Sequence, residues 1–184
     1  MPTDRTTPIG KLIDAYLQGE AQLEDHVIHL LFSANRWEAA ASIRNAVAEG
    51  TTVVIDRYYY SGIVYSAAKG DPTLGLEWAR GPEVGLPAPD LCLFLDVAPG
   101  VVVGRGGFGG ERYETGGMQE RVRGGFLALM GGVDGGGMRV VDAGRGMEVV
   151  EGEVWGIVEG VMGGLHERGE LRSVAAWGKE GVER

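Results

Sequence analysis

An acidic and a basic residue directly follow an apolar run in the first third of the chain. The run, residues 51–55 (TTVVI), is rich in β-branched side chains, and Asp56 and Arg57 come next. If the run is a strand of an open parallel sheet, the pair lies at its carboxyl end, where such sheets bind ligands. Aspartate can hydrogen-bond or hold magnesium through water, and arginine offers a planar fork to phosphate oxygens. A second interpretation stays open, in which Asp56 caps the next helix and Arg57 lies in solvent.

Phe32 and Arg36 form a second pair of residues that could bind a ligand. They are four residues apart in a stretch with helical spacing, so their side chains point the same way. An aromatic face beside a guanidinium suits a planar base, through stacking and through hydrogen bonds to the edge of the base. A phenylalanine at helical spacing is more often a core residue, so this pair alone leaves both interpretations open.

Two other patterns carry little weight. Residues 104–109 (GRGGFG) match G-x-G-x-x-G, but they do not link a strand directly to a helix, as a dinucleotide site requires. His26 and His29 share a helical face with Asp25 nearby, yet no further ligands complete a zinc site. We interpret the first pattern as a loop and the histidines as solvated or half-buried residues.

The elements that must position these residues alternate between helix and strand. Strands are expected at residues 51–55, 91–96 and 138–142, and the first two are continuously apolar, as in strands buried on both faces. Helices are expected at residues 8–17, 25–36, 37–48, 118–130 and 149–165, with a short one opening at Pro99. A further helix is expected to follow Tyr58 and to run through Tyr65 to Lys69. This alternation predicts an α/β fold with a parallel sheet.

Composition and charge limit the function classes. The 184 residues include 44% hydrophobic and 23% charged residues, enough for one core and one domain. The net charge of -9 argues against a nucleic-acid-binding surface, so an anionic ligand must be held by a few placed arginines. The single cysteine, Cys92, cannot form an internal disulfide. No apolar run approaches the length of a membrane span, and we expect a cytoplasmic or nuclear protein.

Five motifs together resemble those of eukaryotic thymidylate kinases in order and spacing, from about residue 5 to residue 161. They are Arg5, residues 30–38 (LLFSANRWE), residues 56–58 (DRY) with Ser61 and Gly62, residues 82–90 (PEVGLPAPD), and residues 107–114 (GFGGERYE) followed by Gln119 and Glu120. The resemblance implies a nucleoside-monophosphate-kinase fold of the P-loop type, with helices flanking a parallel sheet. It also implies transfer of the ATP γ-phosphoryl group to dTMP, with Mg²⁺ as cofactor.

The resemblance implies roles for individual residues. Asp56 and Arg57 would lie at the transferring phosphates, with magnesium held by Asp56, directly or through water. Arg5 would join Arg57 at the dTMP phosphate, Phe32 would stack on thymine, and Arg36 would bond its edge. Tyr65, Tyr113 and Gln119 would line and close the pocket. Arg105 and Arg112 would belong to a lid at residues 104–117. Arginines brought in by a lid can stabilise the negative charge of a phosphoryl transition state.

The 184 residues contain no G-x-x-x-x-G-K-[ST] phosphate loop. The resemblance therefore implies that the first two strands of the family's sheet are missing here, one of them between the strands at 51–55 and 91–96. We expect the 51–55 strand to lack neighbours and the chain to be unstable or to associate through exposed edges. Activity of this chain alone is then in question, and the alternative is a dTMP-binding remnant or partner subunit without ATP-phosphate binding.

We expect a thymidylate-kinase-like domain over residues 1–166 and a polar tail over residues 167–184. Homodimers are common in the resembled family, so a homodimer is expected here, with dTMP and ATP as the small-molecule partners. Neither a nucleic acid nor a membrane is expected as a partner.

Overall fold

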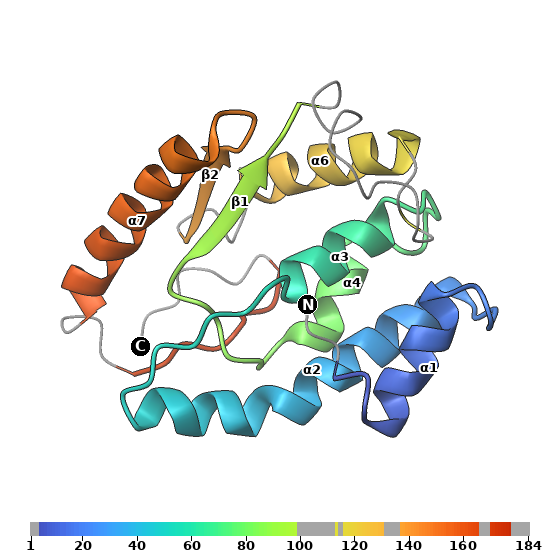
Figure 1. The fold of residues 1–184 in the computed structure, drawn as a ribbon. Helices are drawn as coiled ribbons and strands as arrows, with labels where there is room; N and C mark the ends of the chain where they lie inside the picture. Colours follow the sequence, from blue (N-terminus) through green and yellow to red (C-terminus); the bar gives the residue numbers. More distant parts are fainter. Residues whose placement is uncertain (1–3, 99–112, 114–115, 131–136, 166–169, 178–184) are drawn as a thin grey trace.

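The computed structural model describes residues 4–98, 113, 116–130, 137–165 and 170–177. Within these residues, the sheet has two parallel strands, β1 (Cys92–Asp96) and β2 (Met138–Asp142), in a register that pairs Cys92 with Met138 and Asp96 with Asp142. The strands lie between helix α7 (Met147–Gly164) on one side and helix α6 (Gly116–Met130) on the other (Figure 1). The expected α/β class with a parallel sheet is confirmed.

Helix α6 is fastened to β1 by both apolar and charged contacts. The rings of Phe94 and Phe126 stack with centroids 4.5 Å apart. Arg123 donates two hydrogen bonds, of 2.6 and 2.7 Å, to the carboxylate of Asp96 at the end of the strand. These contacts fix the carboxyl end of β1 against the helix. The expectation that this strand is buried on both faces is wrong, because Leu95 is 52% exposed.

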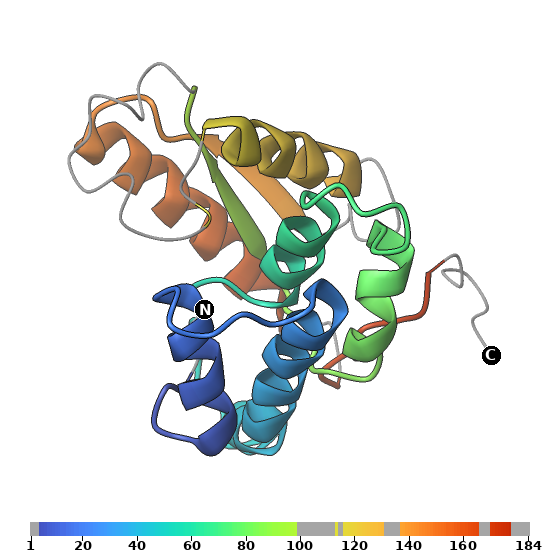
Figure 2. The ribbon, with the colours of Figure 1, turned by 90° about the vertical axis from the view of Figure 1, so that its right-hand side faces the viewer.

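The other helices form a layer beside the sheet (Figure 2). Helix α1 (Pro8–Leu17) begins as expected, with Thr7 accepting a hydrogen bond from the Gly10 amide and proline in the first turn. Helix α2 spans Asp25–Ala48 without a break, whereas the sequence pattern suggested two helices that meet near Trp37. No glycine or proline interrupts this stretch, so nothing in the backbone ends the first helix.

Three short elements complete the helical layer: α3 (Tyr59–Ala67), α4 (Leu76–Arg80) and the 3₁₀ turn η1 (Gly81–Glu83). Helix α3 lies in the centre and contacts α2, α4 and α6. Its Ile63 and Val64 are fully buried, and Val64 packs so closely on α6 that a Cβ at Gly125 would lie 2.8 Å from it. The core of the molecule therefore centres on α3.

Residues 51–55 do not form the buried strand that their composition suggested. They connect α2 to α3 as a coil, and Val54 is 90% exposed (Figure 1). The prediction of a strand here is wrong within the described structure, because β propensity becomes a strand only where neighbours supply a ladder and a surface to pack on. No described segment pairs with these residues.

Helix α7 is the other loosely covered element. None of its residues is buried, and Val149, Trp155 and Met162 are exposed large apolar side chains. We call residues 51–56 together with α7 the open region. In the described part of the chain, no helix is long and apolar enough to cross a membrane.

Residues 172–177, within the predicted polar tail, pack against the core. Val174 exchanges backbone hydrogen bonds with Gly85 and Leu86, at 2.9 and 2.8 Å, and its side chain is buried. Arg80 donates a 2.8 Å hydrogen bond to the carbonyl of Ala175. This segment therefore covers the turn that follows η1.

Candidate functional site

Asp56 and Arg57 lie where the open region meets α3. Arg57 has a φ of 59°, and no other non-glycine residue in the described structure has a positive φ. A left-handed backbone at a residue with a long side chain is uncommon and concentrates at functional sites. The Arg57 guanidinium carbon lies 5.7 Å from the centre of the Tyr65 ring, within the range of a cation–π contact. The turn thus directs Arg57 over α3.

Several predicted substrate-site residues meet in a chain of contacts above α3. The rings of Tyr65 and Tyr113 lie edge to face with centroids 5.7 Å apart, and the Tyr113 hydroxyl donates to the Tyr16 hydroxyl at 3.2 Å. Gln119 donates a 3.0 Å hydrogen bond to the carbonyl of Tyr113. The tertiary structure therefore brings Arg57, Tyr65, Tyr113 and Gln119 together from separate segments. We call these four residues and Tyr16 the aromatic site.

Sequence reasoning missed a cation at the aromatic site. The Lys69 ammonium lies 5.5 Å from the Tyr16 ring centre and 5.6 Å from that of Tyr113, and it forms a 2.7 Å ion pair with Asp25. It contacts the phenolic oxygen of Tyr16 at 3.4 Å. The available signal was weak, since Lys69 only follows Tyr65 by four residues. Its ammonium adds cation–π contacts to the aromatic site, while Asp25 balances its charge.

Phe32 and Arg36 both lie on α2 but have different surroundings. Phe32 is partly buried and packs against the apolar cluster of Ile13, Tyr16 and Ile28, which also contacts Tyr113. Arg36 is only 2% exposed and donates to both carboxylate oxygens of the fully buried Glu83, with its Nε 2.8 Å from Oε2. Sequence reasoning missed Glu83 as the partner of Arg36, because 47 residues separate them in the chain.

A histidine and a serine extend this buried pair. His29 Nδ1 and the Ser66 hydroxyl lie 2.7 Å apart, and His29 Nε2 lies 3.8 Å from Glu83. Burial, and then the positive charge of Arg36, lowers the pKa of His29 to about 4, so the ring is neutral at pH 7. We call His29, Arg36, Ser66 and Glu83 the polar cluster.

The other predicted cations and histidines are located as follows. Arg5 lies at the surface and forms a 2.7 Å ion pair with Asp14 of α1. Arg105 and Arg112, the predicted lid arginines, lie outside the described residues. His26 is partly exposed and contacts Glu24, whose hydrogen bond raises the pKa of the imidazole. Its partner differs from that of His29, so the two rings do not share a ligand.

Of Asp56, Asp96 and Asp142, only Asp56 has no arginine partner among the described residues. Asp96 is occupied by Arg123, whose hydrogen bonds hold the pKa of the carboxyl below its ordinary value, and Asp142 lies 3.7 Å from Arg145. Asp56 is exposed and forms no ion pair with another described residue. One accessible carboxylate fits magnesium, which keeps most of its waters and takes its other ligands from phosphates.

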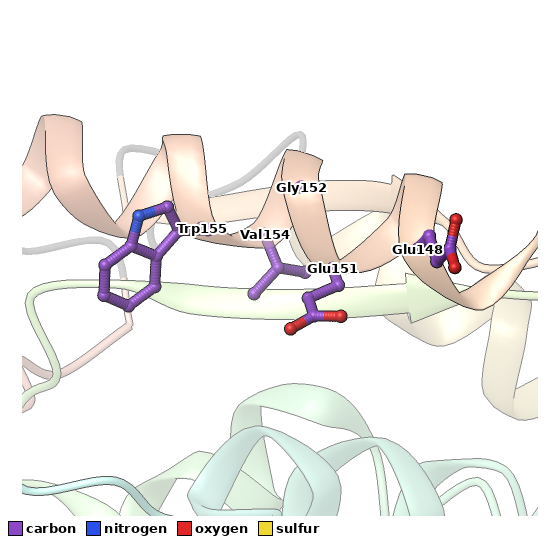
Figure 3. A pocket seen from close by; sticks show the side chains of 5 residues that line it. All are labelled: Glu148, Glu151, Gly152, Val154 and Trp155. Atoms are coloured by element: carbon purple, nitrogen blue, oxygen red, sulfur yellow. The ribbon is translucent and has the colours of Figure 1, made fainter.

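A cavity beside α7 lies away from these residues. It measures about 510 Å³ and is lined by Glu148, Glu151, Gly152, Val154 and Trp155, all from α7 (Figure 3). The carboxylates make it a poor receptor for phosphate. Among the described residues, α7 alone lines it, and no residue of the aromatic site or polar cluster contributes. The chemistry therefore places the candidate site above α3 and not at this cavity.

Comparisons with known proteins identify the family. The thymidylate kinase family model matches residues 2–154. The chain is 44% identical over 170 residues to thymidylate kinase of Danio rerio, covering 91% of this chain and 79% of the relative. It is 46% identical to that of Schizosaccharomyces pombe, covering 89% and 77%, and 44% identical to that of Homo sapiens, covering 82% and 70%.

A solved structure gives the same result for the fold. The structure of thymidylate kinase from Candida albicans superposes with a TM-score of 0.82 at 36% sequence identity, covering 94% of this chain and 83% of that one. The motif order, the grouping of Arg57 with the two tyrosines, and the match over most of the sequence lead to one conclusion. This chain belongs to the thymidylate kinase family.

Proposed function

We propose that this chain acts in the transfer of the ATP γ-phosphoryl group to dTMP, which yields dTDP, and that it supplies the dTMP side of the site. Family membership supports the reaction class. The observation that carries the proposal is the meeting of Arg57, Tyr65, Tyr113 and Gln119 in one chain of contacts. A cation beside aromatic rings suits a ligand that combines a phosphate with a planar base.

The proposed roles follow the chemistry of each side chain. Arg57 and Arg5 bind the phosphate of dTMP, and the left-handed turn at Arg57 presents its fork toward the site. Phe32 stacks on the thymine ring and Arg36 donates to its edge. Tyr65, Tyr113 and Gln119 line the sugar and base pocket.

The donor side of the reaction needs positive charge around the transferring group. Arg105 and Arg112 supply it from the lid segment, because a loose phosphoryl transition state is stabilised mainly by positioned cations. Asp56 holds Mg²⁺, either directly or through water. When bound, the magnesium ion neutralises charge on the phosphate oxygens.

We further propose that the chain forms a homodimer and resides in the cytoplasm or the nucleus. Family resemblance supports the dimer. The net charge of -9 supports the expectation that nucleic acid is not a partner. Sedimentation analysis of the purified chain tests the dimer directly.

Calorimetric titration with dTMP, and separately with magnesium-ATP, tests the proposal. Binding of dTMP is expected, and Arg57→Ala should weaken it by about tenfold or more, because a charge-assisted hydrogen bond to phosphate is lost. Arg145→Ala, which removes an exposed arginine paired with Glu153 at α7, is the matched control and should leave the affinity unchanged. Failure of the unaltered chain to bind dTMP would overturn the proposal.

A phosphorylation assay with both nucleotides separates the two forms of the proposal. Production of dTDP supports a complete kinase. Binding of dTMP without ATP binding or product favours the alternative, in which this chain binds the acceptor but not the donor phosphates. That alternative is motivated by the sequence itself, which contains no G-x-x-x-x-G-K-[ST] motif in its 184 residues.

A further inference from the structure

Lys69 directly follows α3 and contacts three other segments of the chain. Its ammonium forms a 2.7 Å ion pair with Asp25 at the start of α2, donates to the Tyr16 hydroxyl of α1 at 3.4 Å, and lies 5.6 Å from the ring centre of Tyr113. Only 10% of the lysine side chain is exposed. Because lysine usually keeps its ammonium in water and loses rotamer freedom when it is buried, this position calls for an explanation.

Two of these contacts meet at the hydroxyl oxygen of Tyr16. An ammonium group can only donate hydrogen bonds, so this oxygen accepts from Lys69, and it also accepts from the Tyr113 hydroxyl at 3.2 Å. Tyr16 is 2% exposed, so the surrounding core fixes its position. Lys69 and Tyr113 are therefore held at the same buried atom.

Helix α6 holds the backbone on both sides of the lysine–tyrosine contact. Arg121 donates a 2.6 Å hydrogen bond to the carbonyl of Ala68, the residue before Lys69, and Gln119 donates to the carbonyl of Tyr113 at 3.0 Å. These contacts fix the two main chains relative to one helix. They leave the direction of the Tyr113 ring to its side-chain neighbours.

Tyr16, Tyr65 and Lys69 all contact the Tyr113 ring. The two aromatic partners lie at centroid distances of 6.3 and 5.7 Å, at angles of 46° and 65°. Aromatic pairs of this kind are compatible with a range of tilts, whereas an ammonium held by a carboxylate adds a fixed charge for the ring to meet. Tyr65 in turn contacts Arg57, so the direction of one ring affects the whole aromatic site.

Two other roles suit Lys69 less well. As a direct phosphate ligand it would have to leave Asp25, which already balances its charge at 2.7 Å. As a source of stability it would contribute little, because the Asp25 side chain is 40% exposed and ion pairs with exposed partners are weak. The contacts are better explained by the direction that they give to Tyr113.

We propose that Lys69 is a positioning residue of the aromatic site, which holds the Tyr113 ring against Tyr65 in the arrangement that receives the nucleotide. This inference rests on the proposed function, in which the two tyrosines line the sugar and base pocket. Lys69 acts through Tyr113 and not on the nucleotide itself, and Asp25 keeps its ammonium in place. Without the ammonium the ring is free to turn, so binding must first order it, which lowers the affinity.

Calorimetric titrations with dTMP in a double-mutant cycle test this role. The proteins are the unaltered chain, Lys69→Met, Tyr113→Leu and the double variant, each checked for folding by circular dichroism. Lys69→Met should weaken dTMP binding by about fivefold, because cation–π contacts are lost. Combined with Tyr113→Leu, it should have almost no further effect, because the ring that it holds is gone. Lys69→Arg keeps the charge and should restore most of the affinity.

Lys11→Met is the matched control, because Lys11 is an exposed lysine of α1, and it should leave the affinity unchanged. If Lys69→Met does not fold, Asp25→Asn replaces it in the cycle and should cause a smaller loss in the same direction.

The outcomes separate this inference from the proposed function. If Lys69→Met weakens binding equally with and without the Tyr113 ring, its charge acts on the phosphate and the inference fails. Unchanged affinity in Lys69→Met, with normal binding by the unaltered chain, overturns this inference alone. Failure of the unaltered chain to bind dTMP overturns the proposed function, and this inference with it.

Discussion

The polar cluster and the open region reverse the usual distribution of side chains. In the polar cluster, two charged residues and a histidine are buried, although charged side chains normally lie in water. In the open region, Val54 and Trp155 lie in water, although such side chains normally lie inside. The cluster is surrounded by α2, α3 and η1, whereas residues 51–56 and α7 have few neighbours among the described elements.

This contrast shows that neighbours decide burial more than residue type does. A carboxylate can be buried when an arginine from another helix donates hydrogen bonds to it and neutralises its charge, as Arg36 does for Glu83. A β-branched run stays exposed when no strand lies beside it, as at residues 51–55. The polar cluster should therefore respond strongly to substitution, and the open region only weakly.

Removal of one charge from the polar cluster is expected to have the largest effect. Glu83→Gln leaves Arg36 buried beside a neutral amide, and the free energy of unfolding should fall by about 3–5 kcal/mol. Urea denaturation followed by circular dichroism measures the loss. Glu153→Gln is the matched control, because it removes a carboxylate from the exposed pair with Arg145 and should cost about 0–1 kcal/mol. Equal losses of stability in the two variants would show that the polar cluster is no more sensitive to the removal of a charge than the exposed pair at α7.

Protonation of His29 should have the next largest effect. Its pKa is about 4 in the folded protein and 6.5 in the unfolded chain, so between these values the unfolded state binds more protons. The contribution of the buried neutral ring is complete above pH 6.5 and is lost as the pH falls toward 4, about 3 kcal/mol in all.

Urea denaturation at a series of pH values measures the slope of the free energy of unfolding against pH between pH 4 and 6.5. His29→Asn should flatten the slope in that interval, because the titrating ring is gone. His26→Asn is the control, since the partly exposed His26 lies outside the polar cluster, and it should not flatten the slope. An unchanged slope in His29→Asn would show that other groups cause the loss of stability at low pH.

A pair of identical substitutions compares the core with the open region directly. Val64 is fully buried and Val54 is 90% exposed, so Val→Ala at each removes the same atoms from opposite environments. Val64→Ala should cost about 2 kcal/mol, because two methyl groups leave a packed contact with Gly125. Val54→Ala should change the stability by less than about 0.5 kcal/mol. A large loss at Val54 would mean that residues 51–55 are covered in solution.

The smallest effect on stability is expected from polar substitutions in the open region. The double variant Val54→Ser, Trp155→Ser removes two exposed apolar side chains and should leave the free energy of unfolding within about 0.5 kcal/mol of the original. It should, however, reduce concentration-dependent association, because exposed apolar surface promotes association. Sedimentation velocity at several concentrations measures this change, and undiminished association would place the contact elsewhere.

Much of the fold follows from local patterns in the sequence. The expected strand at 138–142 is present as β2, and helical spacing placed α1, α6 and α7 to within two residues at each end. These elements are amphipathic or carry recognisable start signals, such as Thr7 and Pro8. The break expected near Trp37 and the buried strand expected at 51–55 were wrong, because continuity and pairing depend on the surroundings.

The candidate site was only partly predictable. Arg57, Tyr65, Tyr113 and Gln119 were predicted from the family resemblance, and the structure brings them together. Lys69 and Glu83 were missed, because each acquires its position from contacts made across distant parts of the chain. The assignment of a role to each residue remains a prediction for the titrations described above.

By itself, the sequence determined the family and the α/β class, because these depend on residue types at fixed spacings, and its prediction of the site residues stays a prediction. Only the tertiary structure decided that Arg36 is buried against Glu83 and Gly62, that Arg57 adopts a left-handed backbone, and that residues 51–55 stay unpaired. The physical reason is the same in each case. Orientation and burial are set by neighbours that lie close in space and far apart in the chain.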